Sequence, residues 1–137
     1  MKPGVIKWAV VGDIFVVHTT EGRIPDAQWN AFVQEIRARP VRRFLGASTG
    51  ATEVPSTQRK LVTEALAEKK ITSLVITDDR VVRGLATAAS WFGVNIQSFA
   101  WSELDKVMKE LKAGPEQARE LTATLMRLKT ASLAELG

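Results

Sequence analysis

The chain has 137 residues, of which 45% are hydrophobic and 25% are charged, and its formal net charge is +4 at pH 7. This length and composition favour a single globular domain with one hydrophobic core and argue against two full domains or extensive disorder. The chain contains no cysteine, which excludes disulfides, thiolate catalysis and cysteine-bound metal ions.

The first part of the chain predicts a hairpin, a helix and a strand. Residues 5–11 and 14–19 are rich in β-branched and aromatic residues and flank a two-residue turn, a pattern typical of a β-hairpin. Residues 25–39 carry apolar side chains at helical spacing until Pro40, so we expect an amphipathic helix there. An apolar strand is then expected over residues 41–47.

The remaining chain alternates helices with strands. We expect helices over residues 56–70, 80–92 and 102–113, strands over 71–77 and 94–100, and a last helix after Gly114-Pro115. The residues expected to face inward from the helix over 80–92 are Val81, Val82, Leu85, Ala86 and Ala89. Ser102 and Asp105 resemble a capping box. This order predicts an N-terminal hairpin leading into a mainly parallel mixed sheet of about five strands, with right-handed crossovers and covering helices.

Gly114-Pro115 is the one candidate boundary, and it divides the chain into a domain over residues 1–113 and a helical extension over 114–137. The extension carries a coiled-coil-like apolar seam that is too short to stand alone in water. It therefore packs on its own domain, on a helix of a partner, or on a second copy of the chain through self-association. The seam consists of Ala118, Leu121, Leu125 and Leu128.

A polar loop precedes the second long helix and carries most of the candidate functional residues. Ser48 and Thr49 lie between two glycines, where they form either an ordinary connection or, with loop amides, a site for an anion. Ser56 and Thr57 follow Pro55 at the expected helix start. Their hydroxyls either cap the helix, which contributes about 1 kcal/mol, or are modified.

The order of these elements, over roughly residues 4–113, resembles the STAS domain of anti-sigma-factor antagonists. Residues 41–45 resemble the third strand of that family. Pro55-Ser56-Thr57-Gln58 falls where the family has Asp-Ser-x-Gly, with Pro55 in place of the aspartate and Gln58 in place of the glycine. The segment is also similar to divergent STAS-like proteins that are grouped with lipid-binding Sec14-type folds. The resemblance implies that Ser56 corresponds to the regulatory serine phosphorylated by an anti-sigma kinase.

Catalytic residues are not evident. His18 is the only histidine, which excludes a histidine-rich metal site, and its place late in a strand suggests a partly buried residue without an acid or nucleophile beside it. Asp78 and Asp79 end a predicted parallel strand and either cap the next helix or hold magnesium. We expect no enzymatic activity, no metal and no cofactor.

Tryptophans and arginines raise the question of nucleic acid. Trp8, Trp29 and Trp91 lie in the hairpin or near helical apolar stripes, so we expect them in the core, with Trp101 more exposed. A nucleic-acid partner is therefore not expected. The clustered Arg37, Arg39, Arg42 and Arg43 are either a solvated helix end or a patch for phosphate or an acidic protein.

The sequence thus favours a cytoplasmic, non-enzymatic regulatory protein without a membrane span. In this hypothesis it docks to a protein partner, such as an anti-sigma-like kinase, through an interaction loop that includes Ser48, Thr49 and Arg59. Phosphorylation of Ser56 or Thr57 would switch this docking. The alternative is a sensor or carrier that binds a lipid or nucleotide between the sheet and the helices beginning near Arg80 and Ser102.

Overall fold

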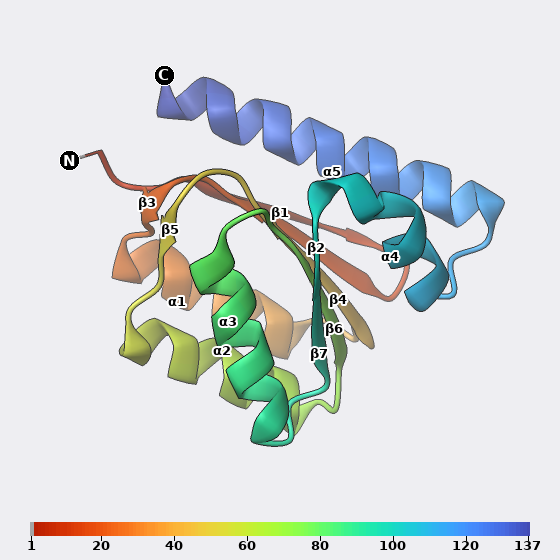
Figure 1. Cartoon of the computed structure of the whole chain (residues 1–137), viewed down its shortest axis with the longest axis horizontal. Coiled ribbons are helices and arrows are strands. Elements are labelled where there is room, and N and C mark those ends of the chain that lie inside the picture. The colour runs from red at the N-terminus through yellow and green to blue at the C-terminus, as the bar shows by residue number, and fades with distance from the viewer. Residues whose placement is uncertain (1) are drawn as a thin grey trace.

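A computed structural model describes residues 2–137 and shows helices on both faces of a central sheet (Figure 1). In chain order, the elements are β1 (Ile6–Val11), β2 (Ile14–Thr19), β3 (Gly22–Arg23), α1 (Asp26–Ala38), β4 (Arg43–Ser48), β5 (Thr52–Glu53), α2 (Ser56–Glu68), β6 (Thr72–Ile76), α3 (Arg80–Trp91), β7 (Ile96–Phe99), the 3-10 helix η1 (Trp101–Glu103), α4 (Leu104–Glu110) and α5 (Pro115–Leu136).

The main sheet has five strands in the order β1-β2-β4-β6-β7. Strands β1 and β2 pair antiparallel across a turn in which Gly12 adopts a φ of +60°, a conformation that glycine reaches without strain. The pairs β2–β4, β4–β6 and β6–β7 are parallel. The predicted α/β fold, with its N-terminal hairpin and mainly parallel sheet, is therefore confirmed. Its parallel strands end at one edge of the sheet, where the polar loop and the start of α2 lie.

One face of the sheet is covered by α1 and α2. Trp29, Phe32, Val33 and Ile36 of α1 are buried, as their helical spacing predicted. On the sheet side, the rings of Phe15 and Phe44 stack with centroids 6.0 Å apart. These side chains share one apolar cluster with Ala65 and Leu66 of α2. Burying whole aromatic side chains makes this cluster a major source of stability.

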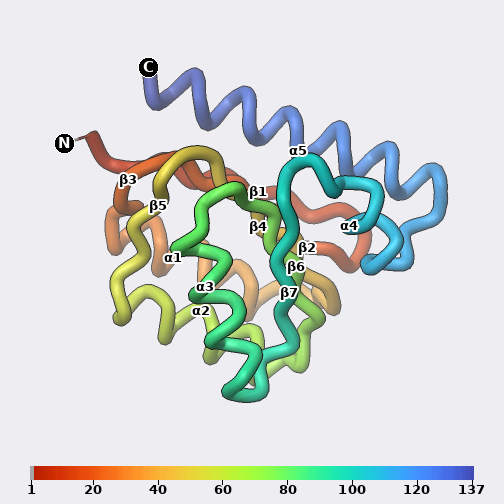
Figure 2. The backbone as a smooth tube through the Cα atoms, in the orientation of Figure 1, coloured from red at the N-terminus to blue at the C-terminus, as the bar shows by residue number. Residues whose placement is uncertain are grey.

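The opposite face is covered by α4 and α5 (Figures 1 and 2). Leu121, Leu125 and Leu128 of α5 are buried in one cluster with Ile14 and Val16 of β2. The apolar seam of the C-terminal helix is therefore occupied by the sheet of its own chain. The two ends of the chain lie on the same side, as Figure 2 shows, and the Lys2 ammonium donates to the Leu136 carbonyl at 3.2 Å.

Helix α3 differs from its prediction. It packs along the edge strand β7, and only Ala86 of this helix is buried. Val81 is 66% exposed and Trp91 is 78% exposed, so the expectations that Val81 faces inward and that Trp91 lies in the core are wrong. The reason is that α3 packs mainly along β7 at the sheet edge, so its remaining sides, which carry Val81 and Trp91, face solvent.

Two local features also differ. Strands β3 and β5 form a two-stranded parallel sheet that is too short for a sequence pattern to indicate. The chain before α4 is fixed by Glu103, whose side-chain oxygen accepts the Ala100 amide at 2.9 Å, and not by the predicted pair Ser102 and Asp105. This bond lowers the pKa of Glu103, with a smaller contribution from Lys106.

Candidate functional site

The first turn of α2, residues 55–60, is called the α2 turn below. Pro55 occupies the N-cap position, with φ −63° and ψ 157°. Its ring fixes φ near this value, and its side chain has no oxygen that could accept a hydrogen bond from the amides of the first turn. Ser56 and Thr57 follow and are both exposed. Neither hydroxyl forms a capping bond within the described residues, so the capping interpretation is wrong. Both hydroxyls are accessible at the positive end of the helix dipole.

Gln58 anchors the α2 turn to α1. Its side chain is buried, and its amide nitrogen donates to the Ile24 carbonyl at 2.7 Å and to Asp26 Oδ1 at 2.9 Å. The Gln58 backbone carbonyl accepts the indole N–H of Trp29 at 2.9 Å. The bond from Gln58 is also the main cause that lowers the pKa of Asp26, ahead of Arg23. Sequence reasoning treated Gln58 only as a replaced glycine and missed this role.

Arg59 places a positive charge in the same turn. It is half-buried, and its guanidinium donates to the Val54 carbonyl at 2.8 Å. Lys60 follows and is exposed, with only a long contact of 3.9 Å to Glu64. Two cations therefore lie within one helical turn of Ser56, which favours an anionic group bound there.

The polar loop is less accessible than predicted. Ser48 is buried, its hydroxyl donates to Thr77 Oγ1 at 2.6 Å, and its carbonyl accepts the Trp101 indole N–H at 2.9 Å. Thr49 is half-buried and pairs with His18 Nε2 at 2.8 Å. Ser48 therefore does not belong to an exposed interaction loop, and Trp101 is half-buried and hydrogen-bonded where we expected exposure.

His18 is completely buried, deeper than its strand position suggested. Burial, and to a smaller extent the nearby Lys129 ammonium, lowers the pKa of His18 from 6.5 to about 4. The Lys129 ammonium itself lies 4.3 Å from the centre of the Trp101 ring. His18 is thus a neutral core residue at pH 7; it lies in β2, next to Thr49 of the loop after β4 and near Lys129 of α5.

The paired aspartates serve the backbone. Asp79 Oδ1 accepts the Val81 amide at 2.9 Å and caps α3, and Asp79 Oδ2 accepts the Thr52 amide at 3.1 Å. Asp78 accepts the Trp101 amide at 3.2 Å. The capping interpretation of Asp79 is therefore confirmed. Residues 2–137 contain no group of three histidine, aspartate or glutamate residues placed to hold a metal ion.

A cavity of about 570 Å³ lies between α2, α3 and the sheet, and it is called the α2–α3 cavity below. Val17, Phe44, Gly46 and Val75 from the sheet, together with Val62 and Leu66 from α2 and Val82, Leu85, Ala86 and Ala89 from α3, form its apolar lining. Arg59 and Lys60 are the only charged residues that line it within the described chain. Ser56 lies on the same lining, so the cavity and the α2 turn adjoin.

The cavity differs in place from the expected ligand site. The helix that begins after Ser102 is α4, which lies on the opposite face of the sheet, so α2 and α3 form the walls. Thr52 lines the cavity near its polar end, and its buried hydroxyl has no hydrogen-bond partner among residues 2–137. A buried hydroxyl without a partner is unfavourable and is satisfied when a polar ligand group or a water reaches it.

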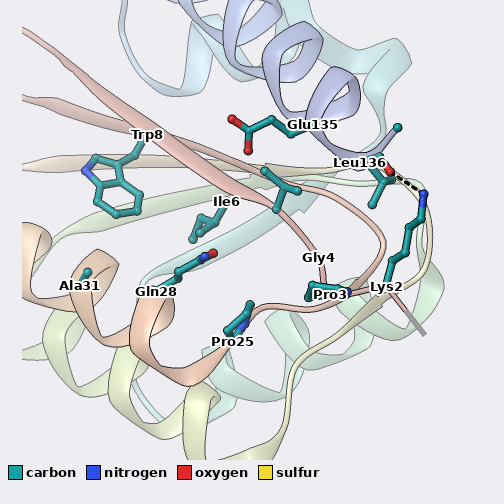
Figure 3. A pocket seen from close by; sticks show the side chains of 12 residues that line it. Lys2, Pro3, Gly4, Ile6, Trp8, Pro25, Gln28, Ala31, Glu135 and Leu136 are labelled. Carbon is teal, nitrogen blue, oxygen red and sulfur yellow. Dashed lines mark hydrogen bonds between the residues drawn. The ribbon is translucent and has the colours of Figure 1, made fainter.

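A second hollow lies between the N-terminal segment, α1 and the end of α5 (Figure 3). Its volume is about 470 Å³, and Trp8, Gln28 and Glu135 are among the residues around it. Glu135 pairs with Lys7 at 2.6 Å. The hollow brings together the two ends of the chain and carries no cluster of reactive side chains within the described residues.

Comparison with known proteins gives no family assignment. No protein-family model matches the chain, and no curated protein matches it. None of the described helices is both long enough and apolar enough to cross a lipid bilayer.

Proposed function

We propose that this protein is a non-enzymatic, STAS-like regulatory domain that binds a protein partner with its α2 turn, and that phosphorylation of Ser56 or Thr57 switches this binding. The observation that supports the proposal is the state of the two hydroxyls. Both are exposed at the start of a helix, and neither is used to cap it. A modifying enzyme can therefore reach either hydroxyl without unfolding α2.

The charges of the α2 turn indicate how phosphorylation would change partner binding. A phosphate adds about 1.5 to 2 negative charges, and a helix N-terminus with adjacent cations accommodates them. Arg59 and Lys60 provide those cations. Because Gln58 ties the turn to α1, phosphorylation changes the charge of the surface while the backbone keeps its place. A partner that recognises the unmodified turn through an acidic surface is then repelled.

Phosphate mapping and partner capture together test this proposal. The purified chain is incubated with ATP and a lysate of its source organism, and phosphopeptides are mapped by mass spectrometry. We expect phosphate on Ser56 or Thr57, and a partner that is retained by Ser56→Ala/Thr57→Ala but released by Ser56→Asp/Thr57→Asp. Thr130→Asp, on the exposed side of α5, is the matched control. Identical partners for the alanine and aspartate variants would refute the switch.

The α2–α3 cavity favours a second candidate function, the binding of a small amphipathic ligand. Its volume of about 570 Å³ lies in the range of small-molecule sites. An apolar lining with only Arg59 and Lys60 as charges suits a ligand with an apolar body and an anionic head. Protein docking remains the first proposal because it needs only the exposed turn, whereas ligand binding requires the cavity to stay open in solution.

Native mass spectrometry of the purified chain tests ligand binding. Ala86 is the buried residue of α3 that lines the cavity, so Ala86→Phe fills the space and is expected to abolish any retained ligand mass. Gly84→Ala is the control on the same helix, because the added methyl group meets no atom within 4 Å beyond its chain neighbours and the adjacent backbone of its own helix. A chain that is always recovered empty would count against this function.

A further inference from the structure

The C-terminal end of α3 exposes two adjacent aromatic side chains, called the aromatic tip below. Trp91 is 78% exposed and Phe92 is 87% exposed, the highest values among the large apolar side chains of residues 2–137. The chain turns sharply after them at Gly93, whose φ is +89°. Adjacent exposed aromatics on a small domain mark an interaction site, since leaving them in water is unfavourable.

The aromatic tip lies at the same end of the sheet as the ends of α1 and α2, because β4, β6 and β7, which follow α1, α2 and α3, begin side by side there. The Ser73 amide donates to the Asn95 carbonyl at 2.8 Å, which holds the loop after the tip against the start of β6, the strand that follows Lys70 and Ile71. The Lys69 ammonium donates to the Ile36 carbonyl at 2.9 Å and so joins the end of α2 to the end of α1. Figure 1 shows the end of α3 at the bottom of the view, where β6 and β7 begin.

This end of the molecule is positively charged. Its cations, called the basic end below, are Arg37, Arg39, Arg42, Lys69 and Lys70. The carboxylates among them are Glu35, which pairs with Arg39 at 3.0 Å, and Glu68, which lies 3.5 Å from Arg37. Asp13 also lies beside Arg42, and its carboxylate pairs with Arg43 at 2.6 Å. Arg42 and Lys70 are exposed and form no ion pair within the described chain. The five cations outnumber these carboxylates, so this end of the sheet, where the aromatic tip also lies, carries an excess of positive charge.

We propose that the aromatic tip and the basic end together form a docking surface for an anionic lipid bilayer. Tryptophan rings favour the interface between lipid and water, and cations near an anionic membrane are attracted to it. The tip is a helix end, so it can insert into a lipid headgroup layer without a preformed pocket. A folded acidic protein would instead have to provide a pocket that matches the two rings. Phe92 also lines the α2–α3 cavity, so the surface continues into an apolar space. The proposal does not depend on either function above.

The size of the effect follows from the charges and rings involved. Each cation near an anionic membrane raises the partition onto it about fivefold, so removing Arg42 and Lys70 lowers it about 25-fold. The same electrostatic contribution is screened by salt. Removing both aromatic rings takes away the apolar part of the contact, and we expect a loss of at least about tenfold.

Cosedimentation of the full chain with lipid vesicles tests the proposal. We expect sedimentation with vesicles of phosphatidylcholine and phosphatidylserine, and little with phosphatidylcholine alone. Trp91→Ser/Phe92→Ser and Arg42→Gln/Lys70→Gln are each expected to lose this binding. The matched controls are Val81→Ser, an exposed apolar residue at the opposite end of α3, and Arg127→Gln, an exposed cation of α5 on the opposite face of the sheet; both are expected to bind as the unaltered chain does.

A second measurement locates the contact without altering the fold. Brominated lipids quench tryptophan fluorescence at the membrane interface, and we expect quenching that Trp91→Phe removes while the vesicles still bind the chain. Equal sedimentation with and without phosphatidylserine would overturn the proposal, as would full binding by either double variant. Binding of soluble polyglutamate without binding of vesicles would also overturn it and would identify an acidic macromolecule as the partner.

Discussion

Acidification is expected to destabilise this protein through His18. Its folded-state pKa is about 4, below the value of 6.5 for an accessible histidine. Above pH 6.5 His18 is neutral in both states, so this contribution to stability is complete. As the pH falls from 6.5 toward 4, the unfolded chain takes up a proton that the folded chain refuses, and stability is lost. Below about pH 4 both states are protonated and the loss stops.

The size of this loss follows from the two pKa values. A tenfold change in proton affinity corresponds to about 1.4 kcal/mol, so the difference between 6.5 and about 4 amounts to about 3 kcal/mol of unfolding free energy. The pKa values of Asp26 and Glu103 are also lowered, so their contributions to the stability of the folded protein are lost as the pH falls. Their contribution lies mainly below about pH 4.5, because it begins at the ordinary pKa of a carboxyl group.

Urea denaturation from about pH 7.5 to pH 4 measures the effect, and His18→Gln is the matched variant. Glutamine offers a polar group near Thr49 and does not titrate, so its unfolding free energy should fall by about 3 kcal/mol less over this range. Lys129→Met should raise the pKa of His18 and flatten the curve in part, since the ammonium lowers that pKa. Equal pH dependence in the unaltered chain and His18→Gln would refute the reasoning.

Three further substitutions test packing and local geometry by the same denaturation assay. Leu125→Ala should lower the unfolding free energy by about 2–5 kcal/mol, because this side chain of α5 is fully buried against the sheet. Arg127→Ala, on the exposed side of α5, should change it by less than about 0.5 kcal/mol. Asp79→Ala removes two backbone hydrogen bonds, one of them the α3 cap, and should cost about 1–2 kcal/mol, more than Asp78→Ala, which removes one. Gly50→Ala should cost about 1 kcal/mol or more, because the φ of +82° strains any other residue.

The sequence predicted the elements of the fold because most of them have a clear periodicity. The apolar spacing of Trp29, Phe32 and Ile36 can be satisfied only by a helix with one buried face, and the structure has that helix. Residues 72–76 form the predicted buried strand. Each of these patterns is local, so the element could be predicted without knowing which other segments pack against it.

The errors concern burial, which depends on what packs against an element. Val81 and Trp91 have an apolar character that suits a core, yet α3 packs mainly along the edge strand β7 and leaves both side chains exposed. No sequence pattern gives the distance of a helix from its neighbours. Trp101 and Gln58 are similar cases, because their hydrogen-bond partners, Ser48 and Ile24, lie far away in the chain. Contacts between segments that are distant in the sequence therefore determine the burial and hydrogen bonding of the residues whose environment was predicted wrongly.

The position of α5 has a consequence for protein synthesis. The strands of the main sheet follow one another in space in the order in which they are translated. The face formed by Ile14, Val16 and Leu45, however, is covered by a helix made of residues 115–136, which leaves the ribosome after all five strands. A nascent chain therefore carries the main sheet with part of one apolar face uncovered until α5 has emerged. Chaperones that shield such surfaces have their opportunity in that interval.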